Sequence, residues 1–124
     1  MEGKSILRDK SYAFAIRVVK LSLFLQSEKR ELVLNKQILR SGTAVGALIR
    51  EAEFGHSRAD FINKMTVSLK EANETEYWLL LLKDTDFIEE KVALSMIADC
   101  VELIKMLIAT IKTAKERLLS SNRK

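Results

Sequence analysis

Apolar residues recur at alternating intervals of three and four residues through almost the whole chain, and this spacing limits the folds that the chain can adopt. Such intervals place side chains on one face of an α-helix. Four series of this kind follow one another along the 124 residues. The chain contains no proline and four glycines, too few for the many turns of an all-β fold. The sequence therefore predicts a few long helices.

We expect helices over residues 5–27, 31–54 and 57–84, and a fourth that begins at Asp86 and continues past Leu118. The segments Ser57-Arg-Ala-Asp60 and Asp86-Phe-Ile-Glu89 resemble capping boxes, in which side chains satisfy the free backbone N–H groups of a first helical turn. Short connections favour antiparallel neighbours. The sequence thus predicts a single domain over residues 1–124, an all-α, antiparallel, up-down-up-down four-helix bundle.

Each predicted helix has one apolar series that should face the core. In the first helix it is Leu7, Phe14, Val18, Leu21 and Leu25, with one gap at Ser11. In the second it is Leu34, Ile38, Ser41, Val45, Leu48 and Ala52. In the third it is Phe61, Met65, Ser68, Ala72, Thr75, Leu79 and Leu82. In the fourth it is Ile97, Val101, Ile104, Ile108 and Ile111, followed by Leu118 after a gap at Lys115.

The second predicted helix contains two glycines, Gly42 and Gly46, each of which weakens a helix by roughly 1 kcal/mol relative to alanine. Because they are four residues apart, they lie on one face and allow another backbone to approach closely. We expect this face to serve helix packing or subunit assembly. Replacing either glycine by leucine should disturb that packing more than it changes helix propensity.

The third predicted helix contains six consecutive apolar residues, Tyr77 to Leu82. Six residues cover the whole circumference of a helix, whereas a four-helix bundle leaves one side of each helix in water. A surplus of apolar surface on two helices favours a homo-oligomer. The alternative is a deeply buried bundle end with one exposed leucine.

The short turn at residues 55–56 sets a register in which Arg40 lies level with Glu71 and one turn from Glu74. We therefore predict an ion-paired network of Arg40 with Glu71 or Glu74, facing a neighbouring helix or subunit. Trp78 belongs to the same predicted structural or interface region. The alternative is a solvated pair that contributes little.

The sequence offers no constellation for catalysis. It has one histidine and one cysteine, and it lacks a glycine-rich phosphate loop. Glu53 and His56 match the Glu-x-x-His spacing of di-iron bundles, but the second pair that such a site needs is missing. We expect Cys100 to be a small core residue. The chain is therefore expected to be a non-enzyme that needs no metal, cofactor or small-molecule substrate.

The first apolar run, residues 12–25, is interrupted by Arg17 and Lys20, so it is not expected to span a membrane. A single cysteine and the lack of a signal-peptide pattern favour the cytoplasm.

The formal net charge is +4, and the predicted bundle concentrates this excess at one end. That end gathers ten lysines and arginines against six acids, whereas the opposite end has five against six. Clustered cations are the footprint of a phosphate-rich partner, although an ordinary solvated surface is the alternative. The candidate nucleic-acid-binding residues are Lys4, Arg8, Lys10, Arg17, Lys20, Arg50, Arg58, Lys112, Lys115 and Arg117.

The segment KQILRSGTAVGALIREAEFGHSRADFINKMTVSLKEANETEYWLLLL, residues 36–82, resembles the four-helix-bundle proteins encoded in intervening sequences of bacterial 23S ribosomal RNA genes. The stretches LRSGT and LKEANETEYWL are the most specific parts of the resemblance, which extends over nearly the whole chain. These proteins are similar to the accessory variability protein of diversity-generating retroelements. The resemblance implies a left-handed bundle that assembles into a homopentamer and has no catalytic residues.

Two functions therefore stand as predictions. The first is a non-catalytic oligomer that binds RNA or other nucleic acid through basic surfaces, as the resemblance to the retroelement protein implies. The second is a structural or adaptor oligomer that binds a protein partner without nucleic acid.

Overall fold

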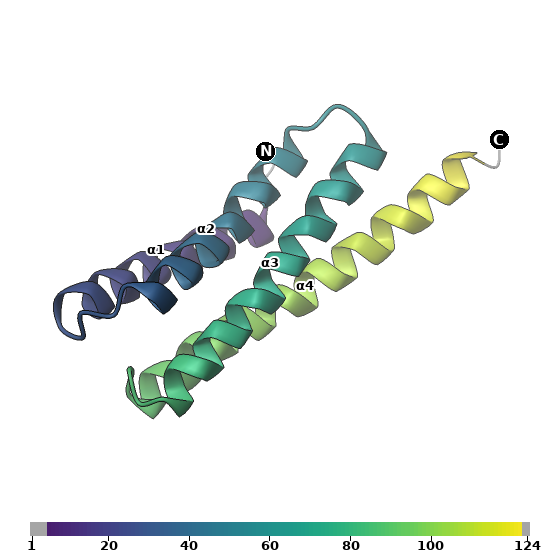
Figure 1. Ribbon diagram of the computed structural model, residues 1–124. Helices are drawn as coiled ribbons and strands as arrows, with labels where there is room; N and C mark the ends of the chain where they lie inside the picture. The colour runs from purple at the N-terminus through teal and green to yellow at the C-terminus, as the bar shows by residue number, and fades with distance from the viewer. Residues whose placement is uncertain (1–4, 123–124) are drawn as a thin grey trace.

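A computed structural model describes residues 5–122 of the chain, which form four helices (Figure 1). They are α1 (Ile6–Ser27), α2 (Val33–Glu53), α3 (Arg58–Asp84) and α4 (Glu90–Asn122). Each helix runs antiparallel to the next, which confirms the predicted all-α four-helix bundle. The helix pairs that follow each other in sequence share the large interfaces, and α1 and α4 share a much smaller one.

At the start of each of the first three helices, a side-chain oxygen accepts a hydrogen bond from a backbone N–H group of the first turn. Ser5 Oγ accepts the N–H of Arg8 at 3.0 Å, and Ser57 Oγ accepts the N–H of Asp60 at 3.1 Å, as the predicted cap requires. The helix α2 begins two residues later than predicted. The Glu31 carboxylate precedes it and accepts the N–H of Asn35 at 2.8 Å.

The predicted start of the fourth helix at Asp86 is wrong. Asp86 has a φ of 63°, the left-handed conformation that aspartate tolerates better than most residues, and α4 begins only at Glu90. The N–H of Asp86 donates to Lys83 O at 3.1 Å, and that of Phe87 donates to Leu82 O at 3.0 Å. These bonds close the end of α3. The segment that resembles a capping box therefore forms a turn.

The core contains the apolar series predicted for α1, the series predicted for α3 except the partly buried Phe61, and most of the series predicted for α2. The series predicted for α4 is offset by one residue up to Ile108, whereas Ile111 is buried as predicted. The residues of α4 that are buried are Ala93, Met96, Cys100, Leu103, Leu107 and Ile111. Ile97, Val101 and Ile104 are only partly buried, and Ile108 is 52% exposed. Both series have three-four spacing, so spacing alone cannot distinguish them. Cys100 is fully buried in the core, as predicted.

The two glycines of α2 pack against α1 of the same chain. A Cβ atom added at Gly42 would lie 2.8 Å from both γ carbons of Val18, which is itself fully buried. A Cβ atom at Gly46 would lie 3.2 Å from Ser11 Oγ. The close approach that the glycines permit is therefore between two helices of one chain, and the burial of Gly42 excludes it from a subunit contact.

The helices α2 and α3 are joined by small polar residues in the core. Thr75 Oγ1 donates to Ser41 Oγ at 2.9 Å, and Ser68 Oγ donates to the backbone oxygen of Val45 at 2.8 Å. Short side chains let the two backbones come close, and their hydroxyl groups find partners without water. The helix α2 is thus packed closely on both sides. Its residues Gly42 and Gly46 contact α1, and its residue Ser41 contacts α3.

The contact at Gly42 predicts that Gly42→Ala destabilises the protein. Alanine would favour the helix by roughly 1 kcal/mol, but overpacking against Val18 costs about 1–3 kcal/mol. We expect the free energy of unfolding, measured by urea titration, to fall. The control is Ala47→Gly, the reverse substitution at an exposed position of the same helix, which measures the difference in helix propensity without a packing change. A more stable Gly42→Ala protein would show that Val18 yields without cost.

The burial of Cys100 predicts an unreactive thiol. Burial raises the pKa of this thiol to about 12, and the nearby Glu76 and Asp99 carboxylates add to the shift. At pH 8 the folded protein should therefore react with a disulfide reagent far more slowly than the unfolded protein, since the thiolate is the reactive form. Absorbance during reaction with and without guanidinium measures both rates. Equal rates would contradict the burial.

Candidate functional site

Five of the predicted nucleic-acid-binding residues are exposed toward the end of the bundle that holds the start of α1, the α2–α3 turn and the end of α4, and the last turns of α4 extend away from the other helices (Figure 1). We call them the basic end: Arg50, Arg58, Lys112, Lys115 and Arg117. They come from α2, α3 and α4. Arg58 Nη1 donates to the backbone oxygen of Arg117 at 3.0 Å, which ties α3 to the last turns of α4.

The cations of α1 are placed differently. Arg8 lies 3.5 Å from Glu53, Lys10 lies 3.2 Å from Glu102, and Arg17 lies 2.7 Å from Asp99. The last two pairs connect α1 to α4. Such partly exposed pairs contribute little to stability, but they neutralise charge that a phosphate would otherwise meet.

Two predicted candidates fall outside both groups. Lys20 is exposed on α1, away from the basic end, and Lys4 lies outside the described residues. The structure therefore does not bring all of the predicted cations to one surface.

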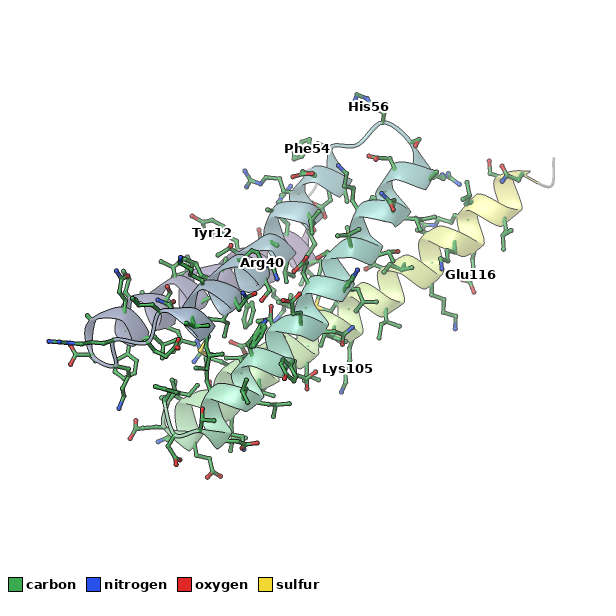
Figure 2. The ribbon with its side chains drawn as sticks, in the orientation of Figure 1. Tyr12, Arg40, Phe54, His56, Lys105 and Glu116 are labelled. Carbon is green, nitrogen blue, oxygen red and sulfur yellow. The ribbon has the colours of Figure 1, made fainter. Side chains whose placement is uncertain are left out.

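Glu53 contributes an interaction that the sequence did not suggest. Its carboxylate accepts a hydrogen bond from the hydroxyl group of Ser5, the residue that caps α1, and it also approaches Arg8. The end of α2 is thereby joined to the start of α1. His56 lies exposed in the α2–α3 turn and points away from the bundle (Figure 2). Glu53 therefore has a structural role, because it links the end of α2 to the start of α1.

The structure contains the predicted pairing of Arg40. Its guanidinium donates to Glu71 at 3.1 Å and also to Glu74, and Glu74 accepts the indole N–H of Trp78 at 3.1 Å. The Trp78 bond and then the Arg40 bond lower the pKa of Glu74, and the Glu74 bond raises the pKa of Arg40. Arg40 lies on the surface of α2 toward α3 (Figure 2), and its side chain is 52% exposed.

Exposed apolar residues occur where they were predicted and also on α1. Tyr77 and Leu80 of α3 are 57% and 39% exposed. On α1, Ile16, Val19 and Leu23 are 42%, 42% and 60% exposed, and we call these three residues the α1 strip. Their spacing of three and four residues forms a second apolar series opposite the core. This series was visible in the sequence and was overlooked beside the core series.

A groove of about 510 Å³ lies between α1 and α2. We call it the α1–α2 groove, and its lining is Arg8, Asp9, Ser11, Tyr12, Ala15, Thr43, Gly46, Ala47 and Arg50. A smaller hollow of about 310 Å³ lies between α1 and the start of α4, with a mainly apolar lining. Sequence spacing could not identify the α1–α2 groove, because it depends on the register between two helices.

Within residues 5–122, no group of three or more histidine, cysteine, aspartate or glutamate side chains is arranged to hold a metal ion. None of the helices described is long and apolar enough to cross a membrane.

Comparison with known proteins places this arrangement in a family. Residues 4–109 match the model of the 23S rRNA-intervening sequence protein family. A crystal structure from Bacteroides thetaiotaomicron, described as a protein with unknown function from the S23 ribosomal protein family, is 55% identical and superposes with a TM-score of 0.85. The alignment covers 86% of this chain and 99% of that one. No curated protein matches. The chain therefore belongs to the 23S rRNA-intervening sequence protein family.

Proposed function

We propose that the protein is a non-catalytic homo-oligomer that binds RNA or other nucleic acid, with the basic end as its principal contact surface. The observation that carries this proposal is the exposure of five cations from three helices at one end of the bundle. Arginine and lysine bind phosphate oxygens without reading sequence, and each added contact steepens the salt dependence. Assembly of several copies would multiply the number of contacts.

Self-association is supported by the α1 strip. The strip and the core series lie on opposite sides of α1, so this helix is apolar on two faces. A helix that is apolar all round is normally buried. The resemblance to the four-helix-bundle proteins encoded in 23S ribosomal RNA intervening sequences implies five subunits, and we therefore propose a homopentamer.

The same strip also favours a second candidate function. If the free protein is a monomer, a protein partner would cover the strip, and the chain would act as an adaptor. Salt separates the two functions, because phosphate binding weakens steeply as salt rises whereas burial of apolar surface does not.

Reversal of two charges tests the basic end. We expect Lys112→Glu with Lys115→Glu to weaken binding to structured RNA and duplex DNA, and to reduce the slope of log affinity against log salt by about two. Lys36→Glu with Lys91→Glu makes the same charge change at the opposite end and serves as the control. Anisotropy titrations between about 50 and 200 mM salt give the slopes. Equal losses in both double variants would place the site elsewhere.

A charge within the α1 strip tests assembly. We expect the solution mass of the wild-type protein to be a multiple of the 14.1 kDa chain and that of Ile16→Lys to fall toward one chain. Sedimentation measures both masses. Asn63→Lys, at an exposed polar position of α3, is the control. A monomeric wild-type protein would remove the oligomer from the proposal, and an unchanged mass for Ile16→Lys would locate the interface outside the strip.

A further inference from the structure

The α1–α2 groove combines an exposed aromatic ring, two arginines and an open space beside the ring. Tyr12 is 64% exposed, and its ring points away from the helices (Figure 2). Two rows of residues form the walls of the groove, Arg8, Tyr12 and Ala15 from α1 and Thr43, Ala47 and Arg50 from α2. Each row has three-four spacing, so each lies along one face of its helix.

The helix register places these groups relative to one another. Ser11 of α1 lies against Gly46 of α2 at the bottom of the groove. Because the helices are antiparallel, Tyr12 is then level with Gly46 and Ala47, and Arg8 is level with the turn that contains Arg50. Glycine and alanine leave the space beside the tyrosine ring open. The arginines lie about one helical turn away along the groove, roughly 6 Å.

The two arginines of the groove differ in their ion pairing. Arg8 approaches Glu53, whereas no ion pair among residues 5–122 includes Arg50. Asp9 also lines the groove, so an extended run of phosphates along it would meet a negative charge. The groove therefore suits one phosphate at the arginine end and a neutral group near Tyr12 and Asp9.

We propose that the α1–α2 groove binds one unpaired nucleotide of single-stranded RNA, with the base stacked on Tyr12 and its phosphate on Arg50. Stacking on an aromatic ring is open to any unpaired base and closed to a base held inside a duplex. The Asp9 carboxylate can accept a hydrogen bond from a ribose hydroxyl group. This inference rests on the proposed function. It adds a site for single strands that shares Arg50 with the basic end and does not include Lys112 or Lys115.

Removal of the ring tests the stacking step. The probe is a short fluorescein-labelled oligoadenylate, compared with an RNA duplex of the same length. We expect Tyr12→Ala to weaken binding of the single strand on the order of tenfold and to leave duplex affinity unchanged. Tyr12→Phe keeps the ring and should restore binding. Phe24→Ala removes an exposed aromatic ring near the other end of α1, outside the groove, and is the control that should have no effect.

Removal of the charge tests the phosphate step. Arg50→Gln should weaken binding of the oligoadenylate and lower its salt slope by about one. Lys105→Gln removes one positive charge from an exposed position of α4, distant from the groove (Figure 2), and should change neither quantity. Circular dichroism and sedimentation of each variant establish that the fold and the mass are those of the wild-type protein.

The outcomes separate this site from the proposed function. If the wild-type protein binds the oligoadenylate and both Tyr12→Ala and Arg50→Gln bind it equally well, the groove is not the site although nucleic-acid binding stands. If Tyr12→Ala changes the solution mass, the groove is a subunit contact. If the wild-type protein binds neither probe at low salt, the proposed function and the groove site are both wrong.

Discussion

The close approach of α2 to its neighbours on both sides determines the rest of this structure. Toward α1, the missing side chain of Gly42 admits Val18, and toward α3, Ser41 meets Thr75. Helices whose backbones lie this near to each other cannot slide without a clash or the loss of a buried hydrogen bond. The register of the first three helices is therefore fixed by small residues, and the larger apolar side chains fill the space that this register leaves.

The fold could be predicted from the sequence because three-four spacing and short connections leave few alternatives for a chain of this length. The turn length between α2 and α3 was enough to predict the pairing of Arg40 with Glu71 and Glu74. The start of α4 could not be predicted, because an Asp-x-x-Glu pattern fits a capping box and a left-handed turn equally well. The core series of α4 was misassigned because two adjacent apolar series have the same period.

The candidate site was less predictable than the fold. Sequence could mark cations, but whether a cation faces solvent or a carboxylate depends on which helix lies opposite. Lys10 and Arg17 meet Glu102 and Asp99 of α4, a helix about eighty to ninety residues away in sequence. Pairs of this kind cancel charge between helices in the middle of the bundle. The positive excess that remains is concentrated at the basic end, where the exposed cations of α2, α3 and α4 outnumber the acids.

Gly46 imposes opposing demands on the chain. Alanine would favour the helical conformation of α2 locally, but its Cβ atom would lie 3.2 Å from Ser11 Oγ and 3.3 Å from the backbone oxygen of Ser11, so one of the two helices would have to shift. The same methyl group would begin to fill the bottom of the groove beside Tyr12. Any larger side chain at this position would therefore reduce the open space of the groove. This one position thus couples the distance between α1 and α2 to the volume of the groove between them.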